Sequence, residues 1–544
     1  TTPVELLADL SGWEEAGIAP ETLSLWTRET SEEPWTLVPS RLEEDVLSAE
    51  LLHFSQYGLG AALTTSGDRP PSTQMFTVDQ FFGSANVAYP IDTPVGLGGL
   101  HPNLAFAYAS SSQDDLVQEG GDWQIVTQAS PVGAGWRLDG INYIARIGNS
   151  NKFSLVLNGK SATILKQDGV WRTAPALFAR LEWAGDNTSS GYGQWIVTTA
   201  DGVRYEFGDT GSMPDGFVAT SATALMLEKT GGGTTFRQVK RWYLRRVVDT
   251  HGNVMAYNYA GERGTERGCV DDGWVNNNRN WYTRALDPTE ILWSRNDAAG
   301  VGEYKMRVRF VYDWVNKRQD VRIKGNADGD CIQAMWGEYN QLKEVRVEVL
   351  TNGAWRAWRT YQLRQEYKPF PTDSAGGMIR LYLTNITQLG ARNGVLPAHS
   401  FAYDMINANR IMLRRADNGQ GGVIMYTYGL LSAACTSGVC PNGSWRLVVM
   451  RSDLADGLNG SIRTDYWYGP GIIANDGGFR GFSYVEITHN DVVRSGAGGG
   501  VIKWEKLETF GGDAGWDRYN PDPRRGRVRR QTIKRDGWTP AVLA

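Results

Sequence analysis

The 544-residue sequence has few of the residues from which catalytic and metal sites are built. It contains only four cysteines and five histidines, and no two histidines stand close together in the chain. It has no Gly-x-Ser-x-Gly motif, and no glycine cluster is followed by the Lys-Ser/Thr pair of a phosphate-binding loop. We therefore expect the protein not to be an enzyme, with no catalytic residue, no cofactor-binding residue and no cofactor.

Long apolar runs and a strong charge of one sign are also missing. No stretch of about 18 apolar residues is present, so the sequence encodes no membrane-spanning helix. The net charge of −5 is small for this length and gives no reason to expect nucleic acid or an anionic membrane as a partner. The chain begins at Thr1 without a methionine and shows no signal peptide, and we expect it to be a piece of a longer polypeptide.

Sustained helical periodicity is nearly absent, and only Val4 to Leu10 suggests a short helix. Instead the chain has 64 Gly, 21 Trp and 23 Tyr, arranged in alternating aromatic and aliphatic runs beside Gly/Asn/Asp turns. The stretches 243–259 and 411–428 each predict a β-hairpin, turning at His251-Gly-Asn253 and Asn418-Gly-Gln-Gly421. The fold class is therefore all-β, with an extended, curved antiparallel hairpin sheet.

One polar, Pro-containing segment divides the sequence. Residues 1–64 have the strand pattern of the C-terminal part of a small β-sandwich-like domain, and residues 65–75 read as a linker. Residues 76–544 contain no second break of this kind and are expected to form one β-unit. Within it, Gly261 to Asn296 shows no alternation and is expected to be an insertion between strands.

The four cysteines allow two disulfides. Cys435 and Cys440 are separated by four residues and are expected to close a small ring, which leaves Cys269 and Cys331 for each other. Two disulfides in loops suit a secreted protein. Four free thiols in a cytosolic protein are the alternative.

One acidic loop has part of the pattern of a calcium site. Asn326, Asp328 and Asp330 alternate like the first half of a calcium-binding loop. Cys331 stands where the turn glycine of such a loop belongs, and Gly337 holds the place of its closing glutamate. A plain acidic turn is therefore the competing reading, and no other cofactor is expected.

Several motifs carry a resemblance to the N-terminal shell region of Rhs/YD-repeat proteins, the group that includes toxin-complex B components and the teneurins. They occur in the order of that family, over about Phe82 to Arg530, at 83–111, 132–146, 418–428, 479–487 and 523–529. Strict Tyr-Asp-x-x-Gly-Arg repeats are missing, since Tyr312-Asp313 and Tyr403-Asp404 stand alone. The C-terminal core of the family, where self-cleavage occurs, is not recognisable.

The resemblance implies a non-catalytic structural segment of a secreted or cell-surface protein. The segment would form part of a β-shell that encloses or displays a C-terminal cargo absent from this sequence. Its partners would be the remaining shell and cargo of the same polypeptide, or a companion subunit. The alternatives are an adhesin that binds a surface protein or glycan through its outer face, and a hydrolase with an unrecognised site. In a shell, we expect tryptophans and tyrosines to wedge between turns of the sheet, and the strand near Gln531 to Lys534 to be an unpaired edge.

Overall fold

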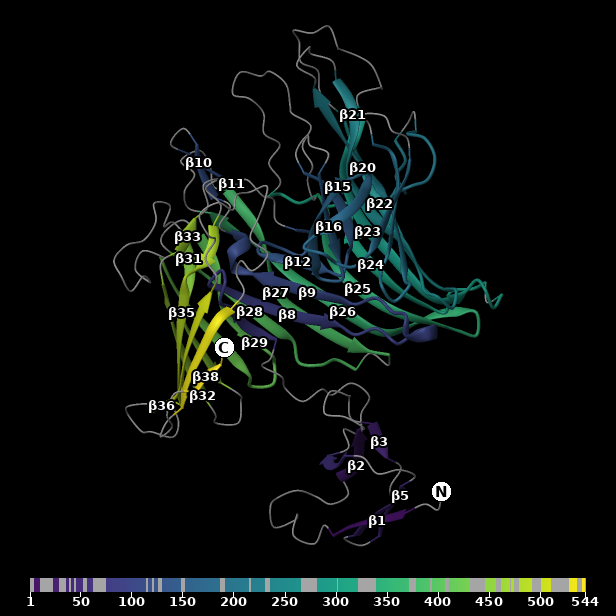
Figure 1. The fold of residues 1–544 in the computed structure, drawn as a ribbon. Helices are drawn as coiled ribbons and strands as arrows, with labels where there is room; N and C mark the ends of the chain where they lie inside the picture. Colours follow the sequence, from purple (N-terminus) through teal and green to yellow (C-terminus); the bar gives the residue numbers. More distant parts are fainter. Residues whose placement is uncertain are drawn as a thin grey trace. The chain divides into compact units, whose positions relative to one another are not determined.

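The computed structural model forms two compact units, Thr1–Ser72 and Thr73–Ala544 (Figure 1). It describes residues 4–9, 23–28, 36–38, 41–43, 46–51, 56–61, 75–113, 116–119, 122–125, 130–147, 152–185, 191–214, 217–229, 235–265, 281–300, 302–320, 339–370, 378–391, 394–406, 410–430, 446–455, 461–469, 471–473, 479–491, 500–509, 528–535 and 541–543. In this part of the chain, no helix is long and apolar enough to cross a membrane.

The described residues of the first unit form two three-stranded sheets, with strand orders β1-β5-β4 and β3-β2-β6. Its strands are β1 (Val4–Asp9), β2 (Leu23–Arg28), β3 (Thr36–Val38), β4 (Arg41–Glu43), β5 (Val46–Leu51) and β6 (Gln56–Ala61). The helix expected at Val4 to Leu10 is wrong, because Val4–Asp9 pairs antiparallel with β5 along its whole length. Helix propensity is weak over one short segment, and pairing with a neighbouring strand overrides it.

The second unit begins with a four-stranded sheet in the order β12-β9-β8-β7, which we call the inner sheet. Its strands are β7 (Phe76–Asp79), β8 (Ser84–Ile91), β9 (Leu104–Ala109) and β12 (Trp136–Asp139). Two 3-10 turns, η2 (Leu97–Gly99) and η3 (Ser110–Gln113), and two separate hairpins, β10 (Leu116–Glu119) with β11 (Asp122–Ile125) and β33 (Gly471–Ile473) with β34 (Phe479–Phe482), accompany the main sheets.

The rest of the second unit is one antiparallel sheet of 24 strands in the described part of the chain, which we call the large sheet. Its order runs from β13 to β32 and continues through β35 to β38, with β21 pairing also with β13 and β19. The first strands are β13 (Tyr143–Arg146), β14 (Phe153–Leu157), β15 (Lys160–Gln167), β16 (Val170–Ala174), β17 (Arg180–Gly185), β18 (Gly193–Thr198), β19 (Arg204–Phe207), β20 (Thr223–Lys229), β21 (Thr235–Val248), β22 (Asn253–Thr265), β23 (Trp281–Asn296) and β24 (Met306–Asp313). The others are β25 (Gln341–Thr351), β26 (Ala354–Phe370), β27 (Met378–Gly390), β28 (His399–Ile406), β29 (Arg410–Asp417), β30 (Val423–Leu430), β31 (Leu447–Ala455), β32 (Ser461–Tyr468), β35 (Tyr484–Asp491), β36 (Gly500–Thr509), β37 (Val528–Arg535) and β38 (Ala541–Leu543).

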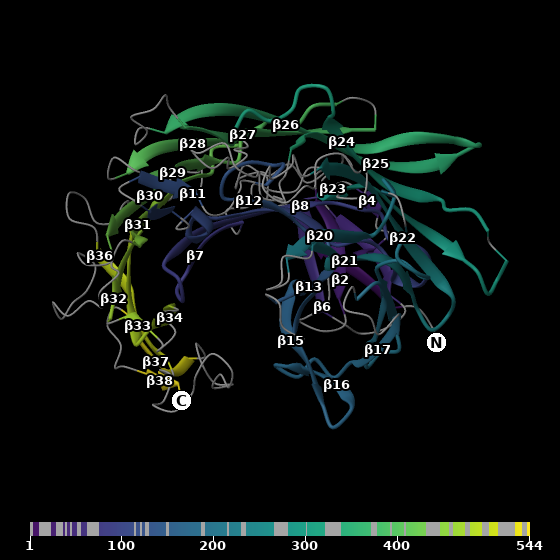
Figure 2. The ribbon, with the colours of Figure 1, turned by 90° about the horizontal axis from the view of Figure 1, so that it is seen from above.

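The predicted all-β class and curved hairpin sheet are confirmed. Seen from above, the large sheet follows an open arc that does not close on itself (Figure 2). Both predicted hairpins form, with Val247 opposite Met255 in one and Ala416 opposite Ile424 in the other. Their turns share one geometry, because the side-chain oxygens of Asp249 and Asn418 each accept two backbone N–H groups of the turn, at 2.9 Å. Gly252 and Gly421 supply the left-handed backbone, at φ +79° and +92°.

Four buried tyrosines recur along the large sheet in the same role. Each hydroxyl donates to a backbone carbonyl of the preceding strand: Tyr259 to Leu244 at 2.6 Å, Tyr403 to Leu383 at 2.7 Å, Tyr428 to Leu413 at 2.8 Å and Tyr468 to Val449 at 2.7 Å. The strand register shifts directly beside three of them, at Tyr259, Tyr403 and Tyr428. Such bulges bend a strand and increase its twist, so their repetition contributes to the curvature of the sheet.

Two expectations for the second unit are wrong. Residues 261–265 and 281–296 are strand rather than an insertion, because β22 reaches Thr265 and β23 begins at Trp281; residues 266–280 lie outside the described residues. Three register shifts between these two strands interrupt the alternation that would have revealed them. The stretch around Gln531 is not an edge, because Gln531, Thr532 and Ile533 pair with β38, a strand of three residues that is too short to show alternation. The expectation that tryptophans and tyrosines wedge between turns of the sheet stays a prediction; Trp136 and Tyr108 of the inner sheet contact the large sheet, as described below.

Candidate functional site: the concave wall of the large sheet

The concave side of the large sheet is partly covered by the inner sheet, which lies inside the arc (Figure 2). Aromatic side chains join the two layers. The indole Nε1 of Trp136 on β12 donates to the hydroxyl of Tyr403 on β28, at 2.7 Å, and the backbone N–H of Leu413 on β29 donates to the hydroxyl of Tyr108 on β9, at 3.1 Å. Burial raises the pKa of Tyr403 well above its usual value of 10, so this hydroxyl stays protonated. The wall is therefore two layers thick in this region.

A buried ion pair links the segment that precedes β12 of the inner sheet to strand β27 of the large sheet. The guanidinium of Arg318 contacts both carboxylate oxygens of Asp320, at 2.9 and 2.7 Å, and both side chains are almost fully buried, at 0% and 2% exposed. Arg318 Nη1 also donates to the carbonyl of Ser130 at 2.7 Å, and Asp320 accepts the N–H of Leu381 on β27 at 3.0 Å. Three segments far apart in the sequence therefore meet at one pair of charges.

Toward its C-terminal end, the concave face of the large sheet carries polar side chains. Tyr426 marks this face, because its hydroxyl donates to the carbonyl of Asn86 on the inner sheet, at 3.5 Å. The pairing registers place Ser452, Thr464 and His489 on the same face, in one row across β31, β32 and β35. Thr464 Oγ1 lies 3.2 Å from His489 Nδ1. Ser452 and Thr464 are 5% and 7% exposed, so this row, a polar strip of the wall, consists largely of buried polar groups that contact one another within the unit.

The charges of this strip are matched to each other. Glu505 on β36 is 7% exposed and receives Lys503 as an ion-pair partner, a hydrogen bond from Gln531 Nε2 at 3.3 Å, and His489 Nε2 at 3.7 Å. Burial, with a further contribution from the charge of Lys503, lowers the pKa of His489 below its usual value of 6.5. His489 is therefore neutral at pH 7, and the strip gains no charge from it.

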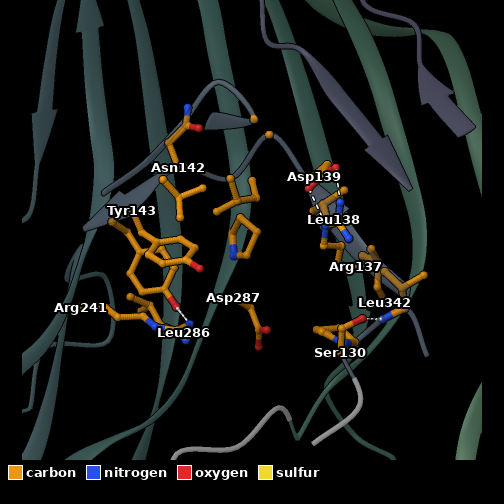
Figure 3. A pocket seen from close by; sticks show the side chains of 18 of the residues that line it. Ser130, Arg137, Leu138, Asp139, Asn142, Tyr143, Arg241, Leu286, Asp287 and Leu342 are labelled. Carbon is orange, nitrogen blue, oxygen red and sulfur yellow. Dashed lines mark hydrogen bonds and ion pairs between the residues drawn. The ribbon is translucent and has the colours of Figure 1, made fainter. Parts of the chain in front are cut away.

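A pocket of about 460 Å³ opens where the chain crosses from the inner sheet to the large sheet. One wall is the connection from β12 to β13, and the other is formed by β21, β23, β24 and β25. Figure 3 shows Arg137 and Asp139 on one side of the pocket, Tyr143 and Arg241 on the other, and Asp287 between them. Much of the remaining lining is apolar and consists of Pro131, Val132, Leu138, Ile141, Val156, Leu286, Pro288 and Leu342.

The acidic group of the pocket is held by an oriented amide. Asp287 is 1% exposed, and its Oδ2 accepts a hydrogen bond from Asn340 Nδ2 at 2.7 Å. Asn340 Oδ1 in turn accepts from the ammonium of Lys317 at 2.7 Å. Because the ammonium can only donate, it fixes which end of the Asn340 amide faces the carboxylate. Asp287 is therefore preorganised on the pocket surface.

The basic group of the pocket is held by aromatic side chains. The guanidinium of Arg241 lies 4.8 Å from the ring centre of Tyr143, a cation–π distance, and its Nη1 donates to the hydroxyl of Tyr243 at 3.4 Å. The other two charges of the lining, Arg137 and Asp139, form a bidentate pair with each other at 2.8 and 3.0 Å. The four lining charges sum to zero, with positive and negative groups in different parts of the pocket.

The site residues predicted from the sequence all lie outside the described residues. These are the calcium-loop candidates Asn326, Asp328 and Asp330 and the disulfide candidates Cys269, Cys331, Cys435 and Cys440. Within the described ranges, no group of three or more His, Cys, Asp or Glu side chains is placed to hold a metal ion. Sequence reasoning missed the pocket because its residues come from segments far apart in the chain, and it missed the Arg318 pair because the Arg-x-Asp spacing gives no sign of burial.

Comparison with known proteins supports a fold assignment. No family profile matches the sequence, and no curated protein matches it. Three solved structures of the TcdB2–TccC3 toxin complex match at 10% identity. The TcdB2-TccC3-TEV structure gives a TM-score of 0.53 over 88% of this chain, and the structure without the hypervariable C-terminal region and the TcdB2-TccC3 structure each give 0.51 over 85%. These matches cover 41%, 40% and 41% of those chains, so this chain spans about two fifths of their length. The chain therefore has the fold of the Rhs-type shell of toxin complexes.

Proposed function

We propose that the protein is a non-catalytic structural segment of a secreted Rhs/YD-repeat-type protein and forms part of a β-shell around a C-terminal cargo. The remaining shell and the cargo would belong to the same polypeptide or to a companion subunit. The observation that carries the proposal is the arc of the large sheet, with its concave side reinforced by the inner sheet (Figure 2). The similarity to the TcdB2–TccC3 shell supports it at the level of the fold.

Continuous strand pairing is suited to a β-shell that encloses another segment. In the described part of the chain, the strands of the large sheet follow one another as hydrogen-bonded neighbours from β13 to β38, so much of their backbone is paired within the wall. The concave strip around Thr464 and His489 is polar and internally charge-matched. Its members Ser452, Thr464 and Glu505 are 5%, 7% and 7% exposed, so the strip stabilises the interior of the wall.

The test uses two positions on one strand that face opposite sides of the wall. Ile462 lies on the concave face, because it pairs with Leu454, which pairs with Ile424, two residues from Tyr426. Trp467 lies five residues farther along β32 and therefore on the convex face. Their exposures are similar, at 40% and 47%. A photo-crosslinking amino acid is placed at each position in the complete polypeptide, expressed in its own host.

Enclosure predicts crosslinks from position 462 to the cargo segment and none to it from position 467. Crosslinks from position 467 to a surface protein or glycan, with none from position 462, would favour the adhesin instead. The crosslinked peptides are identified by mass spectrometry. Recovery of the complete polypeptide in the culture medium, rather than the cell lysate, tests secretion in the same experiment.

A further inference from the structure

A lysine, an asparagine and an aspartate form one hydrogen-bonded chain beside the pocket. The ammonium of Lys317 donates to Asn340 Oδ1 at 2.7 Å, and Asn340 Nδ2 donates to Asp287 Oδ2 at 2.7 Å. Asn340 and Asp287 are 0% and 1% exposed. Because Cγ of Asn340 is bonded directly to Oδ1, the lysine nitrogen lies next to the electrophilic carbon of a buried carboxamide. An amine nucleophile, a carbonyl carbon and a carboxyl group are therefore in place for an amide exchange between two side chains.

The backbone keeps the two reacting side chains together. The N–H of Arg318 donates to the carbonyl of Tyr339 at 3.0 Å, so the neighbours of Lys317 and Asn340 are joined by a main-chain hydrogen bond. The buried pair of Arg318 and Asp320 adjoins the same position. Groups that are fixed in contact react in an effectively unimolecular step, which removes much of the entropic barrier to bond formation.

We propose that Lys317 and Asn340 form an intramolecular isopeptide bond, an amide between Lys317 Nζ and Asn340 Cγ. Glu262 takes a proton from the lysine ammonium, because its Oε2 lies 3.1 Å from Nζ; its Oε1 lies 3.5 Å from Arg284. The neutral amine then attacks Cγ, and the bond from Cγ to Nδ2 breaks. Asp287, in contact with Nδ2, passes a proton from the attacking nitrogen to the leaving nitrogen. The released ammonia takes up the proton held by Glu262 and departs as ammonium, so no other reactant is required.

Burial favours this bond over hydrolysis of the carboxamide. Asn340 is fully buried, so water has little access to its Cγ. The side chain of Lys317 is 42% exposed, which gives the released ammonia a path to solvent. The bond ties the segment that follows β24 to the residue that precedes β25. It is independent of the shell function, since the strand pairing of the wall is the same with or without it.

The first experiment measures the intact mass of the purified full chain after complete reduction, so that disulfides make no contribution. We expect a mass lower than that of the sequence by one molecule of ammonia. In a tryptic digest, we expect residues 310–318 joined to residues 325–343, with no cleavage after Lys317, because its side chain no longer carries a charge. A mass equal to that of the sequence, or unlinked peptides with cleavage after Lys317, would overturn the proposal.

The second experiment uses variants to assign the loss of ammonia. Lys317→Arg keeps a positive charge and removes the nucleophile, so its mass should equal that of its sequence. A loss that persists in this variant arises elsewhere and would overturn the proposal. Lys305→Arg is the matched control, because Lys305 pairs with Glu303 at 2.5 Å and contacts no carboxamide in the described part of the chain; it should keep the bond.

The role of the carboxyl group is tested separately. Asp287→Asn should leave Lys317 and Asn340 unlinked, since the proton transfer to the leaving nitrogen is lost. A complete link in this variant would overturn the role of Asp287. If Asp287→Asn does not fold, the mass and the peptide map of the unchanged protein still decide whether the bond exists.

Discussion

The pair Arg318–Asp320 allows a direct measurement of what burial does to an ion pair, because the chain contains an exposed copy of it. Arg137 and Asp139 have the same spacing and the same two hydrogen bonds, from Nε to Oδ1 and from Nη2 to Oδ2. The side chains of the exposed pair are 55% and 45% accessible, and those of the buried pair are 0% and 2% accessible. The perturbation is Arg→Met in each pair, which removes the charge and keeps most of the side-chain length.

The expected losses differ severalfold. Arg318→Met leaves the carboxylate of Asp320 buried with the Leu381 N–H as its remaining described donor, and it removes the donor to the Ser130 carbonyl. Breaking a buried pair in this way costs about 3–5 kcal/mol. Arg137→Met breaks a pair in contact with water and should cost less than about 1 kcal/mol. The double variant Arg318→Met, Asp320→Leu should recover part of the loss, because no buried charge then remains.

Hydrogen exchange followed by mass spectrometry is the appropriate assay, because a protein of this size need not unfold in a single step. The reporter amides are Leu381, which donates to Asp320, and Ala134, which donates to the Leu381 carbonyl at 2.7 Å. With a tenfold change for every 1.4 kcal/mol, their exchange should accelerate by about a hundredfold or more in Arg318→Met. Arg137→Met should leave them nearly unchanged. Equal acceleration in the two single variants, or an Ala134 amide that exchanges no more slowly in the double variant than in Arg318→Met, would refute the reasoning. The Leu381 amide does not report on the double variant, because Asp320→Leu removes its acceptor.

Four further predictions concern other parts of the molecule. Burial lowers the pKa of His399 from 6.5 to about 4, so the unfolded chain takes up a proton first as the pH falls. The free energy of unfolding should therefore drop by about 2 kcal/mol between pH 7 and pH 5. Urea unfolding midpoints should show a smaller drop for His399→Gln. Gly133→Ala should lower the free energy of unfolding, measured by thermal unfolding, by about 3 kcal/mol or more, since its φ is +143° and an added Cβ would lie 2.9 Å from the Leu383 nitrogen. Gly169→Ala, with φ +78° and open space around it, should lower it by about 1 kcal/mol. The purified protein should show no hydrolase, nuclease or ADP-ribosyltransferase turnover, and activity that persists through repurification would contradict this. Intact mass before and after reduction, with peptide mapping, should reveal the two disulfides Cys435–Cys440 and Cys269–Cys331. Four alkylatable thiols in the native protein would disprove them.

The sequence alone determined the local structure. Alternation of side chains and the turn residues of the hairpins depend only on neighbours within a few positions, so 243–259 and 411–428 could be assigned as hairpins. The Tyr-x-Tyr pairs at Tyr257, Tyr426 and Tyr466 belong to the same local pattern, and in each the second tyrosine is one that donates to the preceding strand. The order of the motifs was also sufficient to indicate a shell-like fold, which the comparison with solved structures then supported.

Long-range packing decided the rest. Register shifts at bulges interrupt the alternation of side chains in β23, so the sequence pattern did not reveal this strand. The sequence also gives no sign that the inner sheet lies on the concave side of the arc. The pocket likewise exists only because the β12–β13 connection crosses in front of four distant strands. The clearest case is the triplet Arg-x-Asp, which occurs at Arg137 and again at Arg318 with the same internal contacts. In both places the i, i+2 spacing brings the two side chains together, although only Arg137 and Asp139 lie on a strand, β12. Whether water reaches them, and therefore what the pair is worth in free energy, depends on which remote segments pack over it.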